Sequence, residues 1–202
     1  MKKKNRVLLG FLLAFIGLFH FIPFYILLTI AFKKVSDLSS KWQIPNYLFL
    51  DNFKYAWTKG NMPRVFLNNV IIVVIALALI IIVGSFSSYP LSRNKTKLTK
   101  SVYSFVVACT IVPALTILVP LYRIMVDIKG ISTYWGIILL HVTFWMPLVV
   151  FLYTGFISMI SSELDDAALI DGLSRFGIFF RIIMPLLKPI TITVIIVCGV
   201  GI

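Results

Sequence analysis

Residues 162–189 read SELDDAALIDGLSRFGIFFRIIMPLLKP, and this stretch decides how the rest of the chain is interpreted. It is a long segment of mixed polarity between two strongly apolar segments. It holds four of the seven acidic residues of the 202-residue chain, namely Glu163, Asp165, Asp166 and Asp171. A charged, ordered loop between two apolar helices is a place where a protein can bind a water-soluble partner.

The local signals in this stretch predict two short helices joined by a corner. Ser162 and Asp165 have the spacing of a capping box, in which each side chain satisfies a free backbone N–H of the first turn. Gly172 supplies the left-handed residue that ends the first helix. Ser174 is placed to cap a second run from 175 to 184, and Pro185 is expected to end it.

Small residues in the first helix predict a surface for close contact. Ala167, Ala168 and Gly172 have little or no side chain, so together they are expected to leave one bare face. Another protein's backbone could lie closely against that face. The alternative interpretation is an ordinary capped helix pair between two spans.

The spacing of these residues resembles the EAA loop of the permeases of ATP-binding-cassette (ABC) importers. Asp166-Ala167-Ala168, three residues, Gly172, nine residues, Ile182, one residue and Met184-Pro185 follow the family pattern, with Asp for Glu and Met for Leu. The run from Glu163 to Gly172 is similar to the carbohydrate branch, in particular the maltose-transporter type. That branch usually has Ile-Pro before the motif and Ala after it, where this chain has Ile160-Ser161 and Leu173.

Composition predicts an all-α integral membrane protein. The chain is 60% hydrophobic with a mean hydropathy of +1.01, far above soluble domains, and its long apolar runs disfavour a barrel. The net charge of +12 lies at the ends of apolar runs, which indicates contact with membrane lipid and no nucleic-acid partner. Cys109 and Cys198 fall in apolar spans and are expected to pack as small hydrophobic residues. No metal-ligand cluster and no cofactor motif is present.

The apolar runs predict a multi-span helical bundle with a cytoplasmic helix-turn-helix loop. A single permease domain, 1–202, is expected, with the coupling loop at 162–188. The predicted spans are 7–32, 66–91, 102–126, 134–156 and 189–202. The last span stops after about 13 apolar residues, where roughly 20 are needed, so we expect a domain that is incomplete at its C-terminus.

Basic residues set the expected topology. Lys2, Lys3, Lys4 and Arg6 precede the first span, and four basic residues lie in the short segment 93–100. The positive-inside rule therefore predicts a cytoplasmic N-terminus in a multi-pass protein of the inner or plasma membrane. His20, inside the first span, is expected to be neutral and bonded within the protein.

Several residues in the spans suggest a translocation path. Pro113 and Pro120 are expected to interrupt the third span and Pro147 to kink the fourth. Tyr122 follows a Pro-Leu pair as in the resembling family. His141 and Trp145 are four residues apart and share a helix face. Either a lining role or plain packing fits these residues.

No catalytic constellation or phosphate-binding glycine loop is visible, so the chain is not expected to be an enzyme. The resemblance implies a permease that carries a sugar or related solute. It implies three partners, which are ABC ATPase subunits, a second permease subunit and an extracytoplasmic solute-binding protein. The residues implied to couple to the ATPase are Glu163, Asp166, Ala167, Ala168, Asp171 and Gly172.

Two other classes of function stay open. A secondary transporter would need an acid in a span, and no Asp or Glu lies in the apolar runs. A non-transporting scaffold or an inactive truncated fragment is the other alternative.

Overall fold

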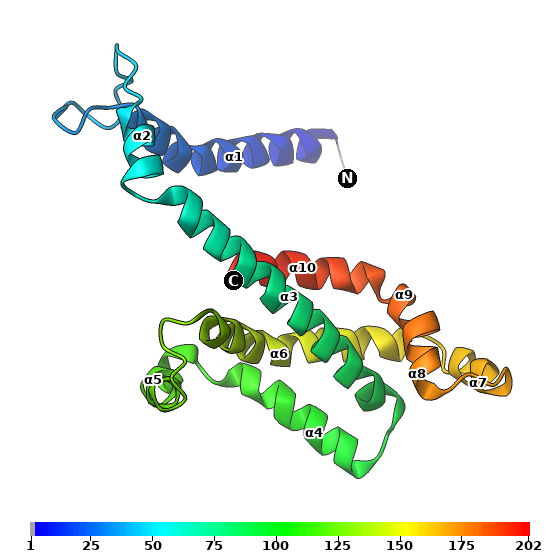
Figure 1. Ribbon diagram of the computed structural model, residues 1–202. Coiled ribbons are helices and arrows are strands. Elements are labelled where there is room, and N and C mark those ends of the chain that lie inside the picture. The colour runs from blue at the N-terminus through cyan, green and yellow to red at the C-terminus, as the bar shows by residue number, and fades with distance from the viewer. Residues whose placement is uncertain (1–2) are drawn as a thin grey trace. The chain divides into compact units, whose positions relative to one another are not determined.

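The computed structural model describes residues 3–202, with the side chains of residues 9–113 and 115–202. Lys2 and the side chains of Lys3, Lys4 and Arg6 lie outside the described residues, so the basic N-terminal segment stays a prediction. The chain divides into two compact units, 1–67 and 68–202, which are described separately. The described residues form helices and connecting segments and no strand (Figure 1).

The first unit is a long helix with a folded connection at its end. α1, Lys3–Ala31, is followed by a segment that bonds back to it, because Thr29 Oγ1 donates to the Lys41 carbonyl at 2.7 Å. The buried Lys33 donates to the Ser40 carbonyl at 2.6 Å. The unit continues into α2, Asp51–Thr58. Within α1, His20 Nδ1 bonds the Ile16 carbonyl at 2.7 Å, which confirms the expected internal bond.

The connection also contains a hydrogen-bonded carboxylate. Asp37 accepts from the backbone N–H of Ser39 at 2.9 Å and from the hydroxyl of Tyr47. Hydrogen bonds from Ser39 and then Tyr47 hold the pKa of Asp37 down, at about 2. The same bond to Asp37 raises the pKa of Tyr47. This group therefore stays ionised at neutral pH and orders the connection.

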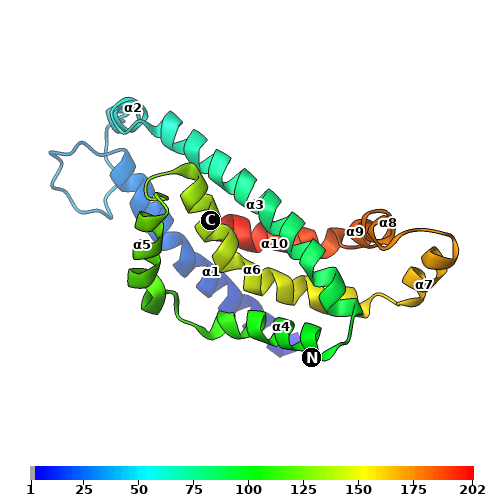
Figure 2. The ribbon, with the colours of Figure 1, turned by 60° about the horizontal axis from the view of Figure 1, so that its bottom comes forward.

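The second unit is built around α6. α3, Met62–Arg93, runs from the first unit into the second, and a tight turn leads to α4, Lys97–Ala108. α6, Tyr134–Met159, continues through Pro147 as one helix. Figures 1 and 2 both show α6 between α4 and α10, Lys188–Gly201.

The segment predicted as the third span is broken near Pro113. The 3₁₀ turns η1, Cys109–Ile111, and η2, Ala114–Ile117, flank the break, and α5, Leu118–Asp127, follows. The helical stretches on either side differ in direction by 93°. The expected interruption at Pro120 was wrong. Pro120 falls in the first turn of α5, where no backbone N–H has an intrahelical partner and proline costs nothing.

The C-terminal region turns a corner later than predicted. α7, Glu163–Ile170, is followed by α8, Arg175–Ile178, a π-helical turn η3, Phe179–Ile183, and α9, Met184–Leu186. Pro185 does not end this helix, which runs on to Leu186 before a 70° bend into α10. In the wider π turn the backbone N–H of Met184 donates to the Phe179 carbonyl, and the helix continues through Pro185. The bend falls at Leu187, which precedes α10.

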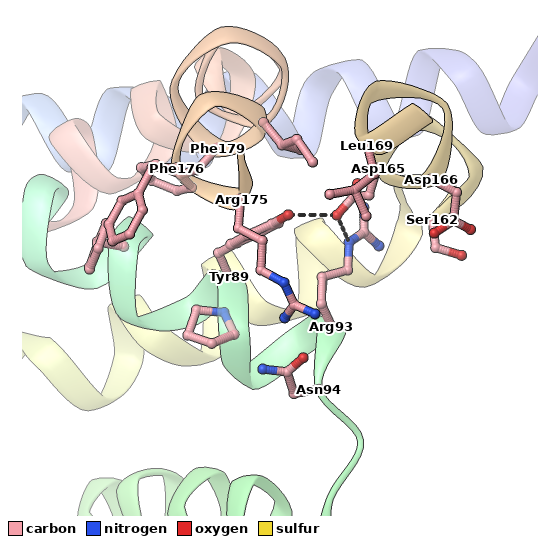
Figure 3. Close-up of a pocket in the computed structure, with 13 residues that line it drawn as sticks. Tyr89, Arg93, Asn94, Ser162, Asp165, Asp166, Leu169, Arg175, Phe176 and Phe179 are labelled. Atoms are coloured by element: carbon pink, nitrogen blue, oxygen red, sulfur yellow. Dashed lines mark hydrogen bonds and ion pairs between the residues drawn. The ribbon is translucent and has the colours of Figure 1, made fainter. Parts of the chain in front are cut away.

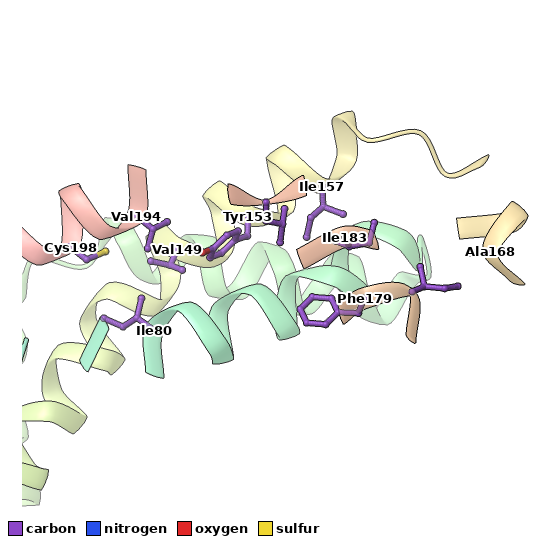
Figure 4. Packing of buried hydrophobic residues seen from close by; sticks show 11 residues of the cluster. Ile80, Val149, Tyr153, Ile157, Ala168, Phe179, Ile183, Val194 and Cys198 are labelled. Carbon is purple, nitrogen blue, oxygen red and sulfur yellow. The ribbon is translucent and has the colours of Figure 1, made fainter. Parts of the chain in front are cut away.

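The core of the second unit lies where α3, α6 and the C-terminal helices meet (Figure 4). A small-residue stripe on α3 allows close approach: a Cβ on Gly84 would lie 2.5 Å from Val149 Cγ1, and Ser88 Oγ is 3.4 Å from the Val150 carbonyl. Cys198 is buried here as expected. Cys109 is exposed in η1, directly after α4, so its expected packing stays a prediction.

Within the part of the chain that the structure describes, three helices are long and apolar enough to cross a bilayer, at Leu9–Ala31, Met62–Arg93 and Tyr134–Met159. The number rises to five if each of the two bent helix pairs forms one span. Many large apolar side chains on these helices are exposed, as expected for surfaces that face lipid tails. The fold is therefore that of an all-helical membrane protein.

Candidate functional site

α7 has one exposed face and one buried face. Glu163, Asp166, Ala167 and Ile170 are exposed, and their i, i+3, i+4, i+7 spacing places them on one side of the helix. Ile170 is 88% exposed. We call these four residues the outer face of α7. It offers one carboxylate pair, a small residue and an apolar anchor.

The buried face of α7 corrects the predicted bare surface. Ala168 is only 4% exposed and belongs to the apolar core with Ile157 and Ile178, so it is not part of the outer face. Adjacent positions on a helix differ by about 100°, so Ala167 and Ala168 point to different sides. Gly172 lies at the end of the helix, where it is exposed together with Asp171.

The start of α7 also differs from the prediction. The side chain of Ser162 makes no capping bond, and its backbone is already helical, whereas an N-cap needs an extended backbone. Instead Ser161 Oγ accepts from the N–H of Glu163 at 3.2 Å. The predicted capping box is therefore wrong, because the Asp165 carboxylate is bound elsewhere.

The end of α7 follows the predicted pattern. Gly172 has a φ of +82°, and the N–H of Leu173 donates to the Ala168 carbonyl at 2.9 Å. This Schellman motif closes the helix. Ser174 then caps α8 by accepting from the N–H of Gly177 at 3.2 Å.

Asp165 is bound to the C-terminal end of α3, as Figure 3 shows. Arg93 Nε lies 3.0 Å from one Asp165 oxygen and Arg93 Nη2 lies 3.0 Å from the other. The Tyr89 hydroxyl donates to the same carboxylate at 2.7 Å. Arg93 Nη1 also donates to the Ile160 carbonyl at 2.9 Å, just beyond the end of α6. We call Tyr89, Arg93 and Asp165 the α3–α7 joint.

A cavity of about 430 Å³ opens beside this joint, between α3, α7 and α8. Phe86, Phe176 and Phe179 form its apolar wall, and Figure 3 shows Arg175 of α8 pointing into it toward Tyr89. Asp166 lies on its rim. The joint and the buried Ala168, which shares the apolar core with Ile178 of α8, hold α7 in place beside the cavity.

The predicted path residues do not gather at this site. Pro113, Pro120 and Tyr122 are exposed around the break between α4 and α5, and His141 is half-buried on α6. Trp145 packs against Gly201 of α10, where an added Cβ would lie 2.2 Å from its ring. None of the five lines the cavity. Their role in a translocation path stays a prediction.

Sequence reasoning missed the joint, although signals for it were present. Tyr89 and Arg93 are four residues apart at the end of an apolar helix, so they share one face. Asp165 was assigned to helix capping. A basic residue at the end of one span and an acid in the following loop could have been paired, but the pattern gives no reason to choose Asp165 over Asp166.

Comparisons with known proteins identify the family of the chain. Residues 80–202 match the family described as binding-protein-dependent transport system inner membrane component. The melibiose/raffinose/stachyose import permease protein MelC of Bacillus subtilis (strain 168) is 44% identical over 197 residues, covering 97% of this chain and 71% of MelC. A probable starch degradation products transport system permease protein, AmyC of Thermoanaerobacterium thermosulfurigenes, is 36% identical over 94% of this chain and 69% of its own length.

A solved structure shares the fold. The crystal structure of a bacterial ABC transporter involved in the import of the acidic polysaccharide alginate covers 100% of this chain and 72% of its own chain. The TM-score is 0.83 at 18% sequence identity, which is a likeness of fold. The family match and the identity to MelC show that the chain belongs to the inner-membrane permease components of binding-protein-dependent ABC transport systems.

Proposed function

We propose that the chain is the permease subunit of a carbohydrate importer and that it docks its ATPase through the outer face of α7. The observation that carries the docking proposal is the exposed set Glu163, Asp166, Ala167 and Ile170 on a short helix held from behind by the joint. Small Ala167 permits close approach, and Ile170 can fill an apolar pocket. Asp166 is available for a basic or donor group, while Asp171 and Gly172 border the face.

The proposed orientation places α7 in the cytoplasm. α7 is attached to the end of α3 next to the turn 94–96, and the segment 93–100 carries Arg93, Lys95, Lys97 and Lys100. Short basic segments stay on the cytoplasmic side. The connection 32–50 then lies outside, where a solute-binding protein delivers its ligand. A second permease subunit and membrane lipid complete the surroundings.

The chain itself has no expected enzymatic role in this proposal. The ATPase subunits hydrolyse ATP, and closure of the ATPase pair moves α7. The broken segment at Pro113 and the polar face of α6 with His141 and Trp145 respond by opening the path to one side or the other. Such alternating access needs two states that the nucleotide favours to different degrees.

The solute is proposed to be an oligosaccharide. Several similar proteins are named for the transport of melibiose, raffinose and stachyose, of starch degradation products or of diacetylchitobiose. The 44% identity to MelC favours galactose-containing oligosaccharides as the first to test. Tyr122, Trp145 and the hydroxyl groups of the spans have the chemistry to contact sugar rings, whose faces are apolar.

The test compares two identical charge reversals in the assembled complex. Asp166→Lys reverses a charge on the outer face, and Asp127→Lys makes the same change on an exposed residue of α5. Asp166→Lys is expected to lose co-purification of the ATPase and uptake of labelled raffinose by about tenfold or more, since rejection of a like charge at an interface costs several kcal/mol. Asp127→Lys should retain both. Equal retention by the two variants would refute docking through α7.

A further inference from the structure

The cation of the joint connects three helices. Arg93 extends from the last residue of α3 and binds Asp165 of α7 with two parallel hydrogen bonds of 3.0 Å. The same guanidinium donates to the carbonyls of Ile160 at 2.9 Å and Ile157 at 3.3 Å, at the C-terminal end of α6. The side chains of Arg93 and Asp165 are only 16% and 11% exposed. Arginine suits this task because its planar fork presents five donors in fixed directions.

The joint is the main polar connection between α7 and the spans. α7 has only eight residues, which is too short to be stable alone, so tertiary contacts must hold it. Ala168 provides a buried apolar contact, and Asp165 and Leu169 line the cavity beside it. Tyr89 adds a second donor from α3 to the same carboxylate. A rotation or displacement of α7 is therefore transmitted to α3 and α6 through the bonds of the Asp165 carboxylate to Arg93.

The two neighbouring acids have separate positions. Asp166 is exposed on the outer face, whereas Asp165 is buried and fully occupied by Tyr89 and Arg93. Loss of Asp165 leaves a buried guanidinium without its counter-charge, which is far more costly than loss of an exposed pair. The outer face can be intact while the inner connection is broken.

We propose that Tyr89, Arg93 and Asp165 are positioning residues that transmit the movement of α7 to α3 and α6 during transport. This inference rests on the proposed function of α7 as the ATPase-docking helix. It assigns docking to the outer face and transmission to the joint. The two steps are separable by mutation.

The test uses the assembled transporter reconstituted in vesicles, with solute transported per ATP hydrolysed as the main readout. Asp165→Asn and Arg93→Gln are expected to keep ATPase co-purification within about twofold and to lower that ratio by about tenfold, within the usual range of couplings between sites. The double variant should be no worse than the worse single variant, since either change breaks the same interaction. Asp127→Asn is the matched control and should keep the wild-type ratio.

A second readout reports the position of α7 directly. Spin labels at Ile170→Cys of α7 and Leu98→Cys of α4, both at exposed positions, are placed in a Cys109→Ser background. The distance distribution should broaden in Asp165→Asn and stay narrow in Asp127→Asn. If either charge variant fails to insert, Tyr89→Phe and Arg93→Lys take its place, and a smaller loss in the same direction is expected.

The outcomes separate the two proposals. Loss of ATPase co-purification in Asp165→Asn would overturn the joint as a transmitting element, because it would then serve docking or folding. An unchanged transport ratio with an unchanged distance distribution would overturn it as well. Failure of the docking proposal has a different signature, namely normal co-purification in Asp166→Lys.

Discussion

The close approach of α3 to α6 at Gly84 predicts the effect of one added methyl group. In Gly84→Ala the new Cβ would lie 2.5 Å from Val149 Cγ1, where ordinary contact begins at 3.4 Å, so the overlap is 3.4 − 2.5 = 0.9 Å. Val149 is completely buried and β-branched, which leaves it a single favoured rotamer in a helix. It cannot swing away, so the helices must separate.

The destabilisation expected for Gly84→Ala is measured against Gly155→Ala, a second glycine substitution within a helix. Overpacking of this kind costs about 1–3 kcal/mol. Replacement of glycine by alanine within a helix also gains up to about 1 kcal/mol from propensity. In Gly155→Ala on α6 no atom lies within 4 Å of the new Cβ, so this variant is expected to gain helix propensity without any steric overlap. The difference between the two variants isolates the overlap, and about 2 kcal/mol corresponds to roughly 4–8 °C in Tm for a chain of this size.

The buried thiol of Cys198 provides the assay. In a Cys109→Ser background, a thiol-reactive dye labels the detergent-solubilised permease only when the core that contains Cys198 opens. Gly84→Ala should melt several degrees below Gly155→Ala, and Val149→Ala combined with Gly84→Ala should cost less than the two single changes added together. Equal melting temperatures for Gly84→Ala and Gly155→Ala would refute the close packing of α3 on α6.

Two further predictions concern the corner and the first connection. Gly172→Ala places a side chain at φ +82° in open space, so left-handed backbone strain alone should lower the free energy of unfolding by about 1 kcal/mol. Gly177→Ala in α8, where no neighbouring atom lies closer than 3.5 Å to the new Cβ, should not lower the Tm. Because the pKa of Asp37 is lowered from 3.8 to about 2, the contribution of its ionised form to folding is present above pH 3.8 and is lost as the pH falls toward 2. Tyr47→Phe should raise the pH at which the connection loosens, measured by the fluorescence of Trp42 in a variant with the other tryptophans replaced; an unchanged midpoint would contradict the role of the Tyr47 bond.

Much of the helix pattern could be predicted because the length of an apolar run can be read directly from the sequence. α1, α3 and α6 need only long apolar runs. The end of α7 could be predicted because Gly172 has a local reason to adopt a positive φ, and the cap of α8 because Ser174 bonds its own first turn. These features depend on neighbours within a few residues.

The errors arise where the surrounding helix or a distant partner overrides the local signal. Pro185 was expected to end a helix, but η3 widens the turn and carries the chain past it. Pro120 was expected to break a span, but the break at Pro113 starts a new helix in which Pro120 sits in the first turn. Ser162 loses its predicted capping partner because Arg93, 72 residues away from Asp165, binds that carboxylate more strongly. No short window of sequence contains both members of that pair.

The adjacent acids Asp165 and Asp166 show why the site needed a structure. Positions one apart on a helix differ by about 100°, so adjacent acids can face in different directions, and here Asp165 is buried while Asp166 is exposed. The buried positions 165 and 168 are spaced i, i+3, and so are the outer positions 163 and 166, and both pairs contain an acid. The choice between the two faces is made by Arg93 and Tyr89, which offer a charge and a hydroxyl to one carboxylate only. In the proposed function α7 binds the ATPase on one side and moves α3 and α6 on the other, so it needs a contact on each side. Asp166 provides the first contact and Asp165 the second.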